Sequence, residues 1–208
     1  MSVKKVAVLV SGGGTNLQAL IDAANAGKLP NARLSLVLSS REDAYALERA
    51  RGAGIPVAVV KRTDSREDYS DRIEAVLRAN GIDLIVLAGF MHILSGKLIR
   101  EYENRIINVH PALIPSFCGE GFFGLRVHEA ALRKGVKVTG ATVHFVNEIA
   151  DGGPIILQKA VAVEEGDTPE TLQKRVMVEA EWKILPEALD LVSRDLVTVA
   201  DGKTVIKK

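Results

Sequence analysis

Short apolar runs, rich in β-branched residues, alternate along the first half of the chain with longer segments whose apolar positions recur at helical spacing. The apolar runs predict buried strands at Val6–Val10, Leu34–Leu38, Val57–Val60, Leu84–Ala88 and Ile106–Val109. The segments between them predict helices at Leu17–Ala26, at Ala44–Ala53, after Ser65, and near Ser95–Tyr102. Strands that are apolar along their whole length, with helices between them, indicate a parallel sheet covered on both faces.

The pattern changes after Thr139. Strands expected at Thr142–Val146 and Ile155–Val163 have only a short polar connection, so we expect them to pair antiparallel at one end of the sheet. Thr168-Pro169 is a favourable helix start, and this last helix should run towards Pro186.

Asp201-Gly202, between two short apolar segments, predicts a hairpin. The expected fold class is therefore α/β: an open, mostly parallel Rossmann-like sheet with helices on both faces and antiparallel strands at one end. No linker, repeat or low-complexity tract divides the sequence. This predicts a single domain over residues 1–208, with a C-terminal helix and a small hairpin from about residue 168.

Charge and composition narrow the possible partners. Of the 208 residues, 27 are basic and 26 acidic, and a net charge of +1 argues against nucleic acid as a partner. The lone cysteine, Cys118, excludes an intramolecular disulfide. The apolar run at Val6–Val10 is too short for a secretory signal, and Leu84–Met91, the longest apolar stretch, is far below the roughly 18 residues of a membrane span. We therefore expect a cytoplasmic protein that binds small molecules and no membrane.

The segment Ser11-Gly12-Gly13-Gly14-Thr15-Asn16 lies between the first predicted strand and the first predicted helix. In an open α/β sheet ligands bind beyond the carboxyl ends of the strands, and glycines let backbone N–H groups approach a phosphate at a helix N-terminus. The segment is not a P-loop, because no Gly-Lys-Ser/Thr follows, and Leu17 stands where the dinucleotide motif has its third glycine. Two interpretations remain: a mononucleotide-type phosphate site, or a tight turn before a capped helix.

Two polar side chains end the fifth predicted strand. Asn108 and His110 are two residues apart, so they should face the same way at one end of the sheet. An amide that donates to a developing oxyanion, beside a histidine that donates or moves a proton, suits acyl transfer. The alternative is a histidine that only hydrogen-bonds at a strand end. Asp151, in Asp151-Gly152-Gly153-Pro154, is either a turn residue or a carboxylate that orients a histidine, and the two interpretations are compatible.

The other aromatic and histidine positions give weaker indications. His144 lies on a predicted strand and is expected in the core or behind the site, whereas His92 and His128 are expected at the surface or in loops. The histidine spacing matches no metal motif, so no metal is expected. The phenylalanines of Phe117–Gly124 form either an apolar lid or ordinary loop packing, and Trp182 is expected to be packed.

Three motifs in order carry a family resemblance: Ser11 to Ala19, Asn108 to Pro115, and His144-Phe145-Val146 followed by Asp151 to Pro154. Together they resemble the folate-dependent phosphoribosylglycinamide formyltransferases of purine biosynthesis. The resemblance extends from Val6 to about Leu189. It implies an enzyme, a monomer or homodimer without a metal, that transfers the formyl group of 10-formyltetrahydrofolate to the amine of glycinamide ribonucleotide.

The resemblance also implies roles for individual residues. The catalytic residues would be Asn108, His110 and Asp151. The ribonucleotide would be bound by Gly13, Gly14, Thr15, Asn16 and, at its ribose, Glu181. The folate would be bound by Arg66, Met91, His92, Ile93, Leu94, Asn147 and Asp151. In this scheme Asn108 and a protonated His110 stabilise the oxyanion, and Asp151 raises the pKa of His110.

The sequence departs from the family pattern in four places. His92 stands where many relatives have arginine, and Ser40 stands where asparagine is common after the second strand. The Phe117–Gly124 segment is longer than in the shortest members, and Val178–Glu181 holds one extra residue before Pro186.

Three other functions are less favoured. A formyltetrahydrofolate deformylase shares the catalytic trio but carries an N-terminal regulatory domain, whereas this chain begins directly with the first predicted strand. A methionyl-tRNA formyltransferase needs a basic C-terminal nucleic-acid domain, for which the charge and length give no indication. A non-catalytic nucleotide-binding protein on the same fold would need the glycine segment but not the trio.

Overall fold

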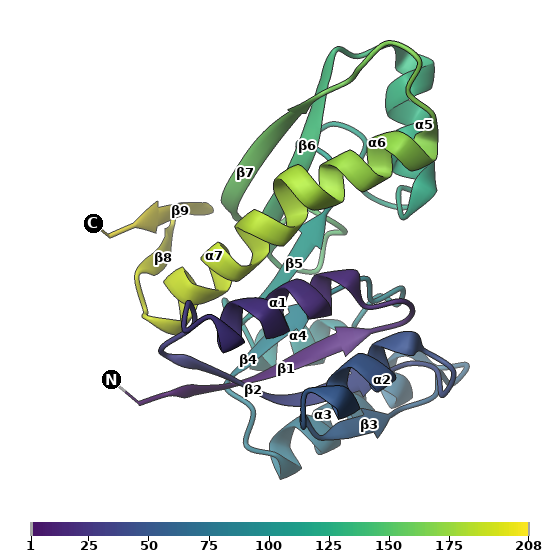
Figure 1. Cartoon of the computed structure of the whole chain (residues 1–208). Helices are drawn as coiled ribbons and strands as arrows, with labels where there is room; N and C mark the ends of the chain where they lie inside the picture. Colours follow the sequence, from purple (N-terminus) through teal and green to yellow (C-terminus); the bar gives the residue numbers. More distant parts are fainter. Residues whose placement is uncertain (1, 208) are drawn as a thin grey trace.

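The computed structural model describes residues 2–207, which form a seven-stranded sheet with helices on both faces and a separate hairpin (Figure 1). The strand order is β3-β2-β1-β4-β5-β6-β7. The strands are β1 (Lys4–Val10), β2 (Ala32–Ser39), β3 (Val57–Val59), β4 (Leu84–Leu87), β5 (Ile106–His110), β6 (Val138–Phe145) and β7 (Ile155–Ala162). Strands β1 to β5 are parallel, and β6 is antiparallel to both β5 and β7. The predicted sheet is confirmed.

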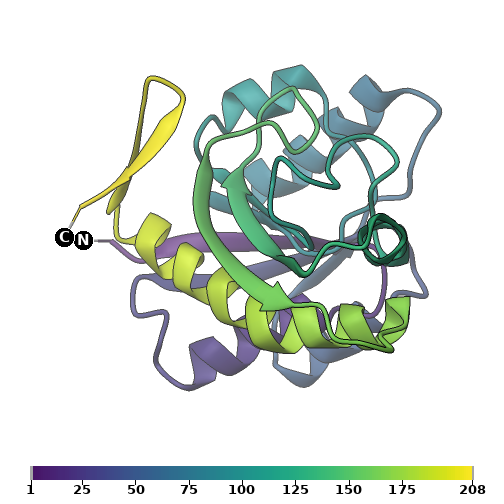
Figure 2. The ribbon, with the colours of Figure 1, turned by 90° about the horizontal axis from the view of Figure 1, so that it is seen from above.

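The helices pack in two layers, and alternate residues of β1 contact one layer or the other. The helices are α1 (Thr15–Asn25), α2 (Tyr45–Gly52), α3 (Arg66–Ala79), α4 (Gly96–Glu101), α5 (Leu125–Lys134), α6 (Pro169–Val176), a π-helical turn η1 (Met177–Glu181) and α7 (Trp182–Ser193). Val6 and Val8 belong to the core that α1, α2, α6 and α7 cover, whereas Ala7 and Leu9 belong to the core under α3 and α4 (Figure 2). A buried parallel strand needs apolar residues on both faces, which explains its continuous apolar run.

Two helices differ from the prediction. Helix α5 was not expected, because it buries few large apolar side chains, and His128 on its buried face is fully enclosed rather than exposed. Burial lowers the pKa of His128 to about 4. Helix α7 continues past Pro186 to Ser193, because Leu185 and Leu189 on its buried face hold it against the sheet although the proline removes one N–H donor.

The predicted C-terminal hairpin is confirmed as β8 (Val197–Ala200) and β9 (Lys203–Ile206), with Asp201-Gly202 between them. Within residues 2–207 no helix is both long and apolar enough to cross a membrane. That the whole chain is one folding domain stays a prediction.

The strand order decides where the site lies. From β1 the chain leads to β2 and β3 on one side and returns to β4 and β5 on the other, so the carboxyl ends of β1 and β4 form a switch point. One register row across the sheet joins Leu9, Leu87, Asn108 and His144. The glycine loop after β1 and the polar end of β5 therefore lie at the same edge of the sheet.

Candidate active site

Two segments bring the predicted trio together. Asn108 and His110 come from the end of β5, and Asp151 comes from the loop between β6 and β7. Asp151 Oδ2 lies 3.4 Å from His110 Nδ1, and Asp151 Oδ1 lies 3.4 Å from Asn108 Nδ2. His144 is also at the site, with its Nε2 3.6 Å from Asp151 Oδ1. One carboxylate thus contacts an amide and two imidazoles.

Asp151 is both a turn residue and a carboxylate directed at histidines. Its φ of 53° lies in the left-handed region, which aspartate and asparagine tolerate in turns. Its Oδ2 accepts a hydrogen bond from Gly119 N at 2.9 Å. Burial pushes the pKa of Asp151 up, but the contacts with His144, His110 and the Gly119 N–H together hold it below the usual value. The carboxylate is therefore ionised at neutral pH.

His110 is buried, with 4% of its surface exposed. Its Nε2 lies 2.8 Å from the carbonyl oxygen of Phe117, and its Nδ1 faces Asp151, so both ring nitrogens face acceptors. Burial lowers the pKa of His110, and it outweighs Asp151 and the Phe117 carbonyl, which both raise it. Asp151 does raise the pKa of His110, as predicted. Burial of the ring lowers this pKa by more, so the net shift is downward.

His144 orients the Asn108 amide. Its Nδ1 lies 2.8 Å from the carbonyl oxygen of Phe145, so Nδ1 carries a proton and donates to that oxygen. Its Nε2 lies 3.2 Å from Asn108 Nδ2. The expectation that His144 lies in the core behind the site is confirmed, since 2% of its surface is exposed. The contacts of the Asn108 nitrogen are long, so an N–H can turn to a substrate oxygen at low cost.

The glycine loop lies beside this group. Ser11 Oγ accepts hydrogen bonds from Ser40 Oγ at 2.8 Å and from Met91 N at 3.0 Å, which join the loop to the segments after β2 and β4. Gly14 precedes α1 with a φ of 72°, and no side chain caps this helix. The first N–H groups of α1 are therefore available to an anion.

Asn16 and Glu181 are joined across the fold. Asn16 Nδ2 donates to Glu181 Oε2 at 2.6 Å, and both side chains are buried. Burial raises the pKa of Glu181 to about 7. Glu181 ends the π-helical turn. The predicted ribonucleotide residues thus lie together, at the first turn of α1 and the start of α7.

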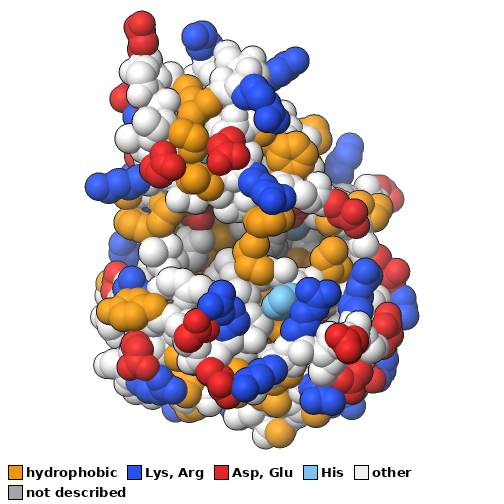
Figure 3. Space-filling view, turned by 90° about the vertical axis from the view of Figure 1, so that its right-hand side faces the viewer, with side chains coloured by type: hydrophobic (Ala, Val, Ile, Leu, Met, Phe, Trp, Pro, Cys, Tyr) orange, Lys and Arg blue, Asp and Glu red, His pale blue; other side chains and the backbone are white. Residues whose placement is uncertain are grey.

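Two adjoining cavities lie on the other side of the trio, and both include His92 and Ile93. The larger, about 340 Å³, is lined by Arg62, Thr63, Asp64, Arg66, Tyr69, Met91, His92 and Ile93. The smaller, about 140 Å³, reaches Asn108 and Asp151 of the trio and is lined by Leu87, Phe90, His92, Ile93, Leu94, Ile99, Asn108, His144, Val146, Asn147, Glu148, Ile149, Ala150 and Asp151. Every residue predicted for the folate lines one of the two. Figure 3 shows this face of the molecule hollowed, with hydrophobic side chains around the hollow.

His92 lies in a loop, as expected, but it is half-buried. Its ring packs edge-on against Tyr69 and Phe90, with centroid distances of 5.4 Å to each. Burial lowers its pKa, and the positive charge of Arg62 adds to this. Arg62 lines the same cavity, so a cation is present there although position 92 is not arginine.

The chain matches the family model described as formyl transferase over residues 4–189. The chain belongs to the formyl transferase family. The resemblance that the motifs indicated is thereby confirmed.

Individual formyl transferases are similar over nearly the whole chain. Phosphoribosylglycinamide formyltransferase of Haemophilus influenzae is 39% identical and aligns with 99% of this chain and 97% of its own length. The crystal structure of glycinamide ribonucleotide transformylase 1 from Symbiobacterium toebii is 41% identical, with a TM-score of 0.93 over 99% of this chain and 95% of that one. The trifunctional purine biosynthetic protein adenosine-3 of Gallus gallus is 45% identical over 98% of this chain. This chain spans about a fifth of the length of that trifunctional relative.

A formyltetrahydrofolate deformylase from Pseudomonas syringae has the same fold. It is 30% identical, with a TM-score of 0.88 over 99% of this chain and 66% of that one.

Sequence reasoning missed two groups that contact the trio. The Phe117 carbonyl contacts His110, and the Gly119 N–H contacts Asp151. Both belong to the Phe117–Gly124 segment, in which the Phe117 ring also packs against Phe122 at a centroid distance of 6.5 Å. Backbone groups have no side-chain signature, so no pattern in the sequence of this formyl transferase could have indicated them.

Gly13 and Gly14 are expected to respond differently to substitution. A Cβ at Gly14 would lie 2.6 Å from Ala46 Cβ on α2, so a side chain there clashes with that helix whether or not a phosphate is bound. Gly14→Ala should lower the free energy of unfolding by about 2 kcal/mol or more, from the clash and the positive φ. A Cβ at Gly13 meets nothing within 4 Å, so Gly13→Ala should fold normally and weaken ribonucleotide binding more than folate binding.

Thermal unfolding and calorimetric titration with each substrate separate the two effects. Equal stability of the two glycine variants would contradict the packing of Gly14 against α2.

Glu181→Gln is expected to stabilise the protein at high pH. Because the folded pKa of about 7 is above the unfolded value of 4.5, the stability from protonated Glu181 is fully present below pH 4.5 and is lost as the pH rises through 7. Glutamine keeps the bond from Asn16 and has no charge to bury. Compared with the parent protein, the free energy of unfolding of the variant should be higher by about 3 kcal/mol at pH 9 and unchanged near pH 4.5.

Denaturant unfolding of both proteins across this pH range measures the difference. If the free energies of unfolding of the two proteins differed by the same amount at every pH, burial would not be raising the pKa of Glu181.

Proposed function

We propose that this formyl transferase moves the formyl group of 10-formyltetrahydrofolate to the primary amine of glycinamide ribonucleotide. The products are formylglycinamide ribonucleotide and tetrahydrofolate, as a step of de novo purine biosynthesis. The observation that carries the proposal is the convergence of Asn108, His110 and Asp151 at the sheet edge, between the glycine loop and the two cavities. The names of the relatives in Haemophilus influenzae and Symbiobacterium toebii support the same reaction.

The glycine loop would hold the phosphate of the ribonucleotide. Backbone N–H groups from Gly13 to Asn16 supply hydrogen bonds, and the start of α1 favours negative charge. Glu181, bonded to Asn16, would reach the ribose after a small movement of the pair. The amine of the substrate would then point along the sheet edge towards Asn108 and His110.

The two adjoining cavities fit a folate. The larger has two guanidinium groups, Arg62 and Arg66, which suit the carboxylates at one end of the molecule. Met91 and Ile93 beside it are each about half exposed, and such apolar surface suits an aromatic ring. The smaller cavity, with backbone and side-chain polar groups from Asn147 to Asp151, suits the polar pterin. The formyl carbon would thus lie next to the trio.

In the proposed reaction the amine nitrogen forms a bond to the formyl carbon, and the bond from that carbon to the folate nitrogen breaks. Negative charge collects on the formyl oxygen between these events. Asn108 Nδ2 would donate to that oxygen, in an enclosed site where such hydrogen bonds are strong. A ring N–H of His110 would join it by turning from the acceptor that it faces, the Phe117 carbonyl or Asp151. Asp151 would accept, through a water, the proton that the amine loses, and would return this proton by the same path to the folate nitrogen as that nitrogen leaves. The scheme uses neither a metal nor a covalent enzyme intermediate.

A comparison of acceptors tests the proposal. The protein is supplied with 10-formyltetrahydrofolate and with glycinamide ribonucleotide, methionyl-tRNA or water alone, and tetrahydrofolate release is followed. We expect release that depends on glycinamide ribonucleotide. Equal release in water alone would identify a deformylase, and release that needs the tRNA would identify a methionyl-tRNA formyltransferase. No release with any acceptor would favour a non-catalytic nucleotide-binding protein.

The remaining partners and properties stay predictions. They are the cytoplasmic location, the absence of nucleic-acid and membrane partners, and a monomeric or homodimeric state.

A further inference from the structure

Helix α2 holds the carbonyl groups of the glycine loop. The Gly12 carbonyl accepts from Ala46 N at 3.1 Å, and the Gly13 carbonyl accepts from Arg49 Nε at 2.9 Å. Both donors belong to α2, and Ala46 also fills the space beside Gly14. The shape of the loop is therefore fixed from the side of α2.

The N–H groups of the loop consequently point the other way. In a trans peptide the C=O and the following N–H are antiparallel, so a Gly13 carbonyl turned to Arg49 directs the Gly14 N–H away from α2. In the same way, the hydrogen bond from Ala46 N to the Gly12 carbonyl directs the Gly13 N–H away from α2. Within residues 2–207 no N–H from Gly12 to Asn16 donates to a protein acceptor. These N–H groups are therefore left for an anion.

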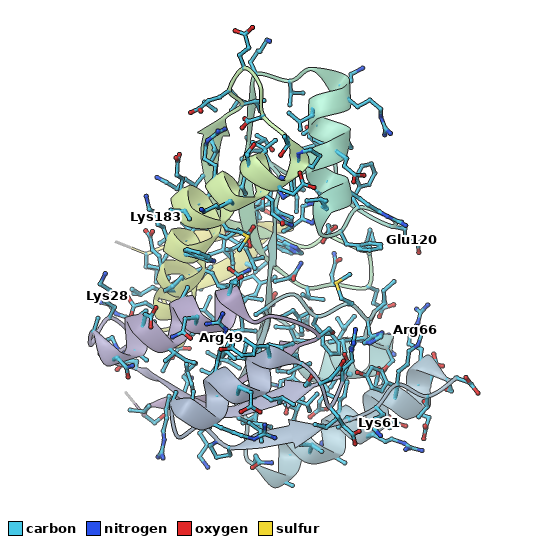
Figure 4. The ribbon with its side chains drawn as sticks, turned by 45° about the vertical axis from the view of Figure 1, so that its right-hand side comes forward. Lys28, Arg49, Lys61, Arg66, Glu120 and Lys183 are labelled. Carbon is cyan, nitrogen blue, oxygen red and sulfur yellow. The ribbon has the colours of Figure 1, made fainter. Side chains whose placement is uncertain are left out.

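Arg49 holds more than the loop. Its Nη1 donates to Gln18 Oε1 at 3.0 Å, and its guanidinium lies 5.0 Å from the centroid of the Tyr45 ring. It thereby bridges the glycine loop and the first turns of α1 (Figure 4). In the described part of the chain no carboxylate lies within 4 Å of Arg49, so its charge is not neutralised by an ion pair.

We propose that Arg49 is a positioning residue for the phosphate of the acceptor substrate. It fixes the peptide between Gly13 and Gly14 so that the Gly14 N–H faces the phosphate, and it places a positive charge behind the loop. The proposal rests on the proposed function, because the phosphate is that of the ribonucleotide. The role of Arg49 differs from that of the loop. The loop N–H groups contact the phosphate, whereas Arg49 contacts the loop from α2 and sets the direction of those groups.

The reason such a residue is needed lies in the glycines. A peptide between two glycines can rotate through conformations closed to other residues, so the Gly13–Gly14 unit has little preference of its own. The bond from Arg49 selects one orientation before the substrate arrives. A hydrogen bond from a charged group typically changes an equilibrium by about ten- to a hundredfold, which sets the size of the expected effect.

The test combines a variant with a change in the substrate. Arg49→Met and the parent protein are compared with glycinamide ribonucleotide and with the matching nucleoside that has no phosphate. We expect Arg49→Met to lower kcat/KM about ten- to a hundredfold for the ribonucleotide and less than threefold for the nucleoside. The KM for 10-formyltetrahydrofolate, and kcat at saturation, should stay unchanged. If Arg49 had only a structural role, Arg49→Met would lower kcat/KM equally for the ribonucleotide and for the nucleoside.

Two further variants complete the test. Arg51→Met removes an arginine of the same helix that contacts Glu48 and not the loop, and it should change nothing. Arg49→Lys keeps the charge without the planar fork, so it should recover less than half of the lost affinity.

The result that overturns the proposal is a loss that is equal for the two acceptors, no loss, or full recovery in Arg49→Lys. If the parent protein transfers formyl to neither acceptor, the proposed function falls, and the role of Arg49 towards this substrate falls with it.

Discussion

Turnover is expected to fall about a hundred- to a thousandfold when His110 is replaced by alanine, because one donor to the developing oxyanion is lost. The KM values for both substrates should change little, since the phosphate and folate regions lie elsewhere along the cleft. Steady-state kinetics with each substrate varied in turn measures the effect.

His110 is enclosed, although it ends a strand at the edge of the sheet. Alanine would therefore leave a cavity and lower stability, so His110→Gln serves as a companion that fills more of the space and keeps an N–H donor. Thermal unfolding shows whether each variant is folded. Turnover within tenfold of the parent in a folded His110→Ala variant would remove His110 from the reaction.

Asp151→Asn is expected to abolish most activity with almost no change in structure. Asparagine tolerates the left-handed φ of 53°, and its amide oxygen can still accept from the Gly119 N–H. The negative charge beside His110 is lost. We expect the melting temperature to stay within a few degrees of the parent and turnover to fall by orders of magnitude.

The same variant should move the titration of His110. Since Asp151 raises the pKa of that ring and burial lowers it, removal of the carboxylate should leave the pKa still lower. Histidine titration by NMR in both proteins shows the shift.

Asp201→Asn is the matched control. Asp201 also has a positive φ, 49°, in the turn between β8 and β9, and it is exposed. Its variant should keep full activity. If Asp151→Asn behaved like Asp201→Asn in both activity and the His110 titration, Asp151 would be only a turn residue.

The sheet could be predicted because its physical requirement is visible in single residue types. A parallel strand buried on both faces must be apolar throughout, and the runs around Val8, Val37 and Val86 meet this requirement. Helix α5 was missed because its buried residues are Val127, His128 and two alanines, so the face that packs against the core holds only one large apolar side chain. The π-helical turn was missed because the apolar positions of a helix do not record which carbonyl each N–H contacts.

The site was predicted in part. That Asn108 and His110 share one face follows from the two-residue period of a strand. The approach of Asp151 depends on the long-range pairing of β5, β6 and β7. The residues around Asp151 left open a turn residue or a carboxylate at a histidine, and the family resemblance indicated the catalytic role. The low pKa of His110 could not be predicted, since it depends on how completely neighbouring segments enclose the ring.

The π-helical turn at Met177–Glu181 makes one contact of the site depend on the length of the chain. Each residue of an α-helix turns the chain by about 100°, so deletion of one residue here would rotate either Glu181 away from Asn16 or the apolar face of α7 away from the sheet. The wider i→i+5 turn present here keeps both contacts. When relatives are aligned, the position of a gap in this helix is therefore as informative as the identity of the residue opposite Glu181.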